Sequence, residues 1–245
     1  MGGFANNAPI VTDGLVFYVD AGNDNSYPGS GTTWSDLMSG IQLTPKNVDA
    51  SNHNTSNAGF FSLDGTDESF DLSDPSLDYD RSNFSVETWV RPTGNHSNWQ
   101  TVVFGKWNTG GGTDNEFSLG FTNSSGPSPF QFSVQSPQNS GGTNGSGLFK
   151  VNSSFNYNAN QWYHLVGTFD GANSTIKLYV DGTLVDTDTS FNDTQAKSVT
   201  TKYYIGAFEV RASVLADIAK CALYSKTLSA SEVTQNYNAL KNRFV

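Results

Sequence analysis

The stretch from residue 161 to residue 185 constrains the fold more than any other part of the chain. It reads QWYHLVGTFDGANSTIKLYVDGTLV, in which runs rich in Val, Leu, Ile and Tyr alternate with short turns. Asp181 and Gly182 connect the last two runs, and a two-residue type I′ turn needs the positive φ that Asp and Gly tolerate. The stretch therefore predicts three consecutive antiparallel strands.

The composition fits a protein built mainly from strands. The chain has 245 residues, and β-sandwiches of roughly 200–250 residues commonly form one domain. It contains 17 Phe, 10 Tyr and 5 Trp for a core and 24 Gly for turns, with 15% charged residues. Disordered chains are poor in aromatic residues. We therefore expect one ordered, turn-rich, all-β domain.

Charge and cysteine content exclude several classes of partner. The net charge of −10 argues against nucleic acid and anionic membranes, which attract clustered Lys and Arg. No run approaches the ~20 apolar residues of a membrane helix, so no membrane insertion is expected. The first residues lack the basic and apolar regions of a signal peptide, so none is expected. Cys221, the single cysteine, is predicted to be a buried hydrophobe.

Strand patterns continue along most of the chain. In 84–92 the even-numbered residues from Phe84 to Val90 should share one face of a strand, with Glu87, Trp89 and Arg91 on the other. Loops rich in Gly, Ser, Asn and Pro separate the strands and are too short for domain linkers. Strands are also predicted at 14–20, 60–65, 69–72, 101–106, 116–121, 130–135, 148–151, 202–207 and 215–224.

The C-terminus carries a helix signal. Ser229 and Glu232 form the pattern of a capping box, in which both side chains satisfy free amides at a helix start. Apolar residues then recur at helical spacing and should dock on the sandwich: Val233, Tyr237, Leu240 and Phe244. We predict a helix over about 229–243, a single domain over 13–245, and an extended N-terminal arm over 1–12 that adds little to the sandwich.

Four separated segments resemble one family. The 161–185 stretch resembles the W-Y-H-x-V-x-T-Y-D-G…L-Y-V-D/N-G signature of laminin G-like, concanavalin A-type jelly rolls, and LDGTDE at 63–68 resembles their F-D-G-x-x-D-Y turn. The segments 10–37 and 222–237 resemble the opening and the closing R-I-Y-N-R-A-L-S-x-x-E-I-x-Q-N-Y of such domains in tailed-phage structural proteins. The resemblance implies a two-sheet antiparallel jelly-roll sandwich with one C-terminal helix.

The same resemblance implies a function. We expect a non-enzymatic virion surface protein, either a capsid decoration or tail-associated, that contacts host or environmental glycans. Its partners would be other virion proteins, and it would be present in several copies or as a homo-oligomer on a particle assembled in the host cytoplasm. The alternative is a purely structural decoration or fibre-tip protein without sugar binding. The absence of a repetitive shaft slightly favours attachment to the capsid.

Catalytic patterns are missing from the sequence. Glycoside hydrolases need two carboxylates roughly 5–9.5 Å apart around the scissile bond. Related jelly-roll hydrolases place them in an E-x-D-x-x-E pattern, and this chain has none: Glu87 and Glu116 stand alone. The three His residues show no metal spacing and no nucleophile partner. We therefore expect no enzyme activity, and a glycoside hydrolase is the least favoured class.

Two loops carry candidate binding residues. One combines aromatic and amide side chains, which stack on sugar rings and bond to their hydroxyls; its candidates are Trp99, Trp107, Asn108, Asp114 and Asn115. The alternative is that Trp107 covers the edge of the core. Calcium binds several oxygen ligands, and the family resemblance implies a site at the sandwich rim, where Asp64, Asp67 and Glu68 share a turn. The alternative is a solvated acidic turn in which Asp64 bonds to its own backbone.

Overall fold

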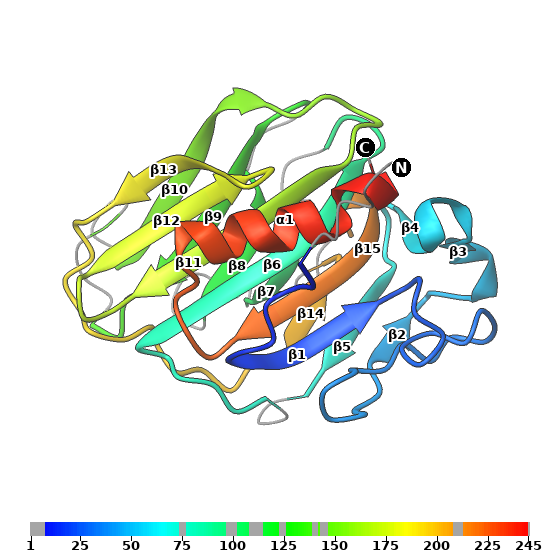
Figure 1. The fold of residues 1–245 in the computed structure, drawn as a ribbon, viewed down its shortest axis with the longest axis horizontal. Coiled ribbons are helices and arrows are strands. Elements are labelled where there is room, and N and C mark those ends of the chain that lie inside the picture. Colours follow the sequence, from blue (N-terminus) through cyan, green and yellow to red (C-terminus); the bar gives the residue numbers. More distant parts are fainter. Residues whose placement is uncertain are drawn as a thin grey trace, which may run out of the picture.

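The computed structural model describes residues 8–73, 77–96, 102–107, 115–122, 126–138, 142, 147–207 and 213–244. Within these residues, two antiparallel β-sheets pack face to face, and one α-helix lies across the outer face of one sheet (Figure 1). The predicted fold class is confirmed. No helix in this part of the chain has the length and apolarity needed to cross a membrane.

Eight described strands form the sheet beneath the helix. Their spatial order is β13 (Thr183–Asp188), β12 (Thr175–Val180), β11 (Tyr163–Asp170), β6 (Asn83–Pro92), β15 (Leu215–Tyr224), β4 (Phe60–Asp64) and β3 (His53–Asn54), and β1 (Leu15–Asp20) also pairs with β15. Short 3₁₀ helices, η1 (Ala50–Asn52) and η2 (Ser56–Ala58), lie on either side of β3.

Seven described strands form the second sheet. Their order is β10 (Leu148–Asn156), β9 (Pro129–Gln135), β8 (Phe117–Phe121), β7 (Val102–Lys106), β14 (Tyr203–Ile205), β5 (Ser69–Leu72) and β2 (Thr44–Lys46). The sequence did not predict β2 and β3, which are only three and two residues long.

The three-strand stretch folds as expected at one edge of the first sheet. Strands β11, β12 and β13 pair antiparallel in sequence order. Asp181 and Gly182 have φ angles of 50° and 78°, so both central turn residues are left-handed. The Asp181 carboxylate also accepts the backbone N–H of His164 at 2.8 Å, which fixes the turn against the preceding strand.

Strand β6 lies between β11 and β15 and is buried on both faces. Phe84, Val86 and Val90 point into the core between the sheets, as the alternation predicted. Trp89 points to the other side, where it packs against the helix. The face of β6 that carries Glu87 and Trp89 is therefore also covered by protein.

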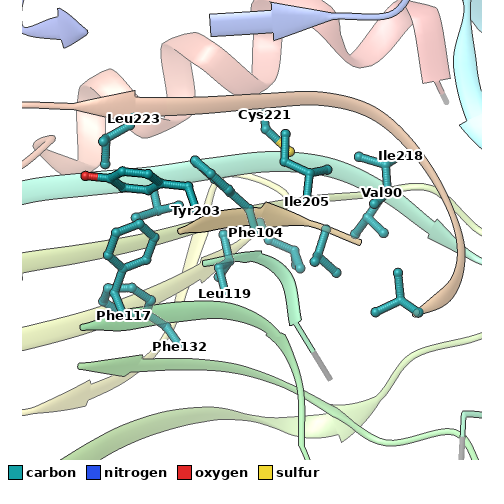
Figure 2. Close-up of a cluster of buried hydrophobic side chains, with 14 of the residues drawn as sticks. Val90, Phe104, Phe117, Leu119, Phe132, Tyr203, Ile205, Ile218, Cys221 and Leu223 are labelled. Carbon is teal, nitrogen blue, oxygen red and sulfur yellow. The ribbon is translucent and has the colours of Figure 1, made fainter. Parts of the chain in front are cut away.

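The core between the sheets is dominated by aromatic and branched side chains. Figure 2 shows Phe104, Phe117, Leu119 and Phe132 of the second sheet facing Val90, Ile218 and Leu223 of the first. Cys221 lies in the same layer and is fully buried. Burial raises the pKa of its thiol to about 12, so Cys221 is a buried thiol, as expected.

Helix α1 (Ala230–Phe244) begins at the predicted capping box. The Ser229 N–H donates to Glu232 Oε2 at 2.9 Å, and the Glu232 N–H donates to Ser229 Oγ at 3.3 Å. Val233 and Phe244 are buried, whereas Tyr237 and Leu240 are half-buried against Trp89 and its neighbours. The apolar stripe therefore docks on the sheet.

Part of the predicted N-terminal arm, residues 9–11, contacts helix α1, whereas residues 1–7 lie outside the described residues. The Val11 N–H donates to Asn236 Oδ1 at 2.7 Å, and Gln235 Nε2 donates to the Pro9 carbonyl at 2.7 Å. Val11 is 7% exposed and packs with Leu228 and Val233. Residues 9–11 are thus part of the helix–sheet layer, because apolar Ile10 and Val11 find a partner on α1.

Candidate functional site

A pocket opens at the end of the sandwich where β6 begins and β9 ends. Its volume is about 500 Å³, within the roughly 300–1,000 Å³ usual for small-molecule sites. The lining is mostly polar and comes from three separate segments: Tyr79, Asp80, Arg81, Ser82, Pro137, Gln195, Ala196, Lys197 and Ser198.

Backbone hydrogen bonds hold the pocket segments together. The Ala196 N–H donates to the Arg81 carbonyl at 2.9 Å, and the Lys197 N–H donates to the Gln135 carbonyl at 2.8 Å. The segment 195–198 therefore bridges the two sheets. On the opposite wall, the Asp80 carboxylate accepts the Ser82 N–H at 2.8 Å and so closes a local turn before β6.

A buried glutamate positions the arginine of the pocket. Glu116 Oε1 accepts hydrogen bonds from the Tyr79 hydroxyl and from Arg81 Nε, the latter at 2.8 Å. Lys106 Nζ lies 3.1 Å from Glu116 Oε2, and both side chains are fully buried. Burial, together with the nearby charge of Glu116, raises the pKa of Tyr79 well above its ordinary value, so the phenol stays a donor.

The Arg81 guanidinium is the group this arrangement presents to the pocket. Its side chain is 29% exposed, and its carbon Cζ lies 5.4 Å from the centroid of the Tyr79 ring. Among the described residues, only Nε is engaged in a hydrogen bond, to Glu116. The two terminal nitrogens can therefore donate to a ligand from a fixed position.

The structure places only part of the sugar site predicted from the sequence. Trp99, Asn108 and Asp114 lie outside the described residues. Trp107 directly follows Lys106 and is half-buried, and Asn115 directly precedes Glu116 and is 6% exposed. Because the Glu116 N–H donates to the Lys106 carbonyl at 2.9 Å, Trp107 and Asn115 flank the buried ion cluster. Neither residue lines the pocket.

The acidic turn proposed for calcium bonds to itself. Glu68 Oε2 accepts the Asp64 N–H at 2.9 Å, and Asp64 Oδ1 accepts the Thr66 N–H at 2.8 Å, while Asp67 is exposed. Burial raises the pKa of Glu68, whereas hydrogen bonds from the turn lower that of Asp64. Within the described residues no three His, Cys, Asp or Glu side chains are placed to hold a metal ion. Asp64 therefore bonds to the backbone of its own turn, and calcium binding at this turn stays a prediction.

Sequence patterns did not reveal the pocket residues. Asp80 and Ser82 could have been recognised as a turn before a strand. The segment 195–198, however, lies more than a hundred residues away and has no motif of its own. Its position follows from the path of the chain between β13 and β14 and from its bonds to Arg81 and Gln135.

Comparisons with solved structures agree on the architecture. The chain superposes on a Trypanosoma rangeli sialidase in complex with the inhibitor DANA, with a TM-score of 0.63 and 15% identity over 98% of this chain and 35% of that one. It matches domain 4 of an extracellular GH43 arabinanase from Geobacillus stearothermophilus, in complex with arabinotriose, with a TM-score of 0.61 and 16% identity over 91% and 98% of the two chains.

A third match is the binding domain of botulinum neurotoxin DC in complex with SialylT. The TM-score is 0.62, with 14% identity over 93% of this chain and 52% of that one. The chain thus spans about a third of the sialidase and about half of the toxin domain, but nearly all of the arabinanase domain. At identities this low, these superpositions establish a shared fold and nothing more.

No curated protein sequence matches the chain. A laminin G-type family model matches residues 64–234 of the chain. This range includes the strands from β5 to β15 and the start of α1. With the two-sheet architecture, this match places the chain in the concanavalin A-like lectin/glucanase superfamily.

Proposed function

We propose that the chain is a non-catalytic glycan-binding module whose sugar contacts lie in the Arg81 pocket. The observation that carries the proposal is the Arg81 guanidinium, which Glu116 holds by Nε in a residue that lines a polar pocket of about 500 Å³. The arabinanase domain is in complex with arabinotriose, and the botulinum neurotoxin binding domain is in complex with SialylT. These matches support the class of ligand.

The pocket offers the chemistry that a saccharide requires. Sugar hydroxyls need donors and acceptors at fixed positions, usually beside an aromatic surface. Arg81 donates, and the side chains of Ser82, Gln195 and Ser198 can donate and accept. Backbone bonds hold the segments that carry these groups, so little conformational entropy is lost on binding.

Two carboxylates near the pocket are already engaged, which favours binding over hydrolysis. Glu116 is fully buried and accepts from Tyr79 and Arg81 beside Lys106. Asp80 accepts the Ser82 N–H and the Asn83 side-chain amide. A glycosidase needs one carboxyl group as acid and a second as base or nucleophile at the scissile bond. We therefore propose no hydrolytic activity.

We further propose that the module sits on a virion, as a capsid decoration or tail-associated protein in several copies. This setting rests on the resemblance of residues 10–37 and 222–237 to domains of tailed-phage structural proteins. Mass spectrometry of purified virions from the virus that encodes the chain tests it. Absence of the protein from particles that carry the capsid proteins would contradict it.

The experiment for the sugar site is a glycan array with neutral and acidic glycans, followed by calorimetry on the best ligand. We expect Arg81→Ala to weaken binding at least about tenfold, which corresponds to about 1.4 kcal/mol. The matched control is Lys46→Ala, which removes an exposed cation from β2, outside the pocket. Trp107→Ala tests the loop predicted from the sequence.

Three outcomes separate the alternatives. Loss with Arg81→Ala but not with Trp107→Ala supports the pocket. The reverse places the ligand at the loop and contradicts the pocket assignment. A wild-type protein that binds no glycan on a broad array contradicts the proposed function and favours the purely structural role.

A further inference from the structure

A buried polar cluster lies between α1 and the sheet, away from the pocket. Glu87, in the middle of β6, has its two carboxylate oxygens bonded to two different elements. Lys220 Nζ of β15 lies 2.5 Å from Oε1, and Asn236 Nδ2 of α1 lies 2.6 Å from Oε2. All three residues are 0% exposed. One carboxylate therefore bridges an amine and a primary amide in the absence of solvent.

The Asn236 amide is polarised at its oxygen as well as at its nitrogen. Oδ1 accepts the Val11 N–H at 2.7 Å, and Nδ2 also lies 2.9 Å from the Tyr224 hydroxyl. A backbone N–H on a carbonyl oxygen stabilises the negative charge that develops there when a nucleophile attacks the carbon. The docking of the N-terminal segment on α1 thus completes the surroundings of the amide.

Other groups around Glu87 keep the cluster closed. His164 Nε2 lies 3.1 Å from Oε1, and the Tyr224 hydroxyl lies 3.3 Å from Oε2. The Tyr18 ring covers Lys220 Nζ at 5.0 Å. Removing an ammonium and a carboxylate from water costs several kcal/mol for each ion. A reaction that eliminates both charges removes this desolvation cost.

We propose that Lys220 and Asn236 join in an intramolecular amide bond, with Glu87 as the catalytic residue. Glu87 takes one proton from the Lys220 ammonium, and the neutral Nζ attacks Cγ of Asn236. A new Nζ–Cγ bond forms, the Cγ–Nδ2 bond breaks, and Nδ2 leaves as ammonia with a second proton from Nζ, passed by Glu87. The products are a secondary amide, a protonated Glu87 and free ammonia, so atoms and charge balance.

The geometry requires one movement. The Lys220 Nζ must shift from Oε1 of Glu87 towards the amide carbon that lies beside Oε2. Lysine has a flexible stem of four carbons, and the ammonium remains in contact with the same carboxylate along this path. The bond would link the last strand, β15, to the C-terminal helix. Helix α1 would then stay covalently attached to β15 even when the rest of the chain unfolds.

The test is the intact mass of the purified full chain. Loss of ammonia lowers the mass by about 17 Da relative to the sequence. Succinimide formation at an Asn-Gly step, such as Asn144-Gly145, also loses ammonia, so trypsin is the second measurement. An amide on Lys220 blocks cleavage after that residue and joins peptide 212–226 to peptide 227–241. A succinimide leaves Lys220 cleavable.

Three variants make the assignment specific. We expect Glu87→Gln to retain the full mass, and Asn236→Asp to lose water, about 18 Da, because the leaving group changes. The matched control, Asn238→Asp on the same helix, should still lose ammonia and keep the linked peptides. A wild-type protein with full mass and a cleavable Lys220, both when fresh and after prolonged incubation, would overturn the proposal whatever the variants do.

Discussion

The rings of Trp89 and Phe244 stack with their centroids 4.4 Å apart and their planes 22° apart. Trp89 comes from the centre of β6 and Phe244 from the last turn of α1, so this pair anchors the end of the helix. Trp162 closes the cluster, with its ring centroid 4.8 Å from that of Phe244.

Phe244→Ala should lower the free energy of unfolding by about 3 kcal/mol, the usual penalty for removing a buried ring. Tyr237→Ala should cost less, because Tyr237 is only half-buried beside Trp89. Urea denaturation measures both. Asn242→Ala, on the exposed side of the helix, is the control. Equal stability of Phe244→Ala and the control would show that the helix end is not anchored.

Glu116→Gln should destabilise the protein by about 3–5 kcal/mol, because it removes the negative charge between buried Lys106 and Arg81. Asp71→Asn is the matched control. It breaks the ion pair with Lys202, whose side chain is 49% exposed, and should cost less than about 1 kcal/mol. Thermal or chemical denaturation distinguishes the two, and similar losses would contradict the central role of Glu116.

The stability should fall in mild acid because of His96. Burial lowers the pKa of its ring to about 4, from the ordinary 6.5. The unfolded chain protonates this side chain as the pH falls through 6.5, but the folded chain does so only near pH 4. Stability is therefore full above pH 6.5 and falls by about 3 kcal/mol on the way to pH 4. Denaturation at several pH values should show this slope, and His96→Gln should reduce it; an unchanged slope argues against His96.

Gly22→Ala should severely impair folding. A Cβ at this position would lie 1.4 Å from the Ala58 carbonyl oxygen and 2.7 Å from Arg243 Nη2. Gly40→Ala is the control, since its Cβ would meet open space. The substitution at Gly40 should cost only about 1–2 kcal/mol of stability, because alanine would have to adopt the positive φ of 74°. Soluble yield and melting temperature provide the comparison, and a Gly22→Ala protein as stable as the control would contradict the close approach.

Local patterns predicted the parts of the fold that local chemistry determines. The Asp181-Gly182 turn follows from backbone preference, and the Ser229–Glu232 cap follows from hydrogen bonding within four residues. Strand β6 was located correctly, but burial of its Glu87 face was not anticipated. That burial depends on α1, which begins about 140 residues later in the chain.

The candidate site was predicted less well, because it depends on contacts between distant segments. Trp107 and Asn115 were chosen for their side-chain types in one loop, whereas the pocket joins Arg81 to the segment 195–198. Glu116 stood alone in the sequence, yet it is the centre of an ion cluster with Arg81 and Lys106. No spacing rule relates residues 81, 116 and 196.

Helix α1 gives the molecule a polarity along its length. The helix runs along the outer face of the first sheet (Figure 1). It starts near the pocket end, where the Leu228 N–H donates to Ser85 Oγ at 2.8 Å, and its last turn packs on Trp162. Fifteen helical residues carry the chain about 22 Å along this path. An attachment made after Phe244 would therefore hold the module at one end. The Arg81 pocket would then lie at the end of the module opposite the attachment point.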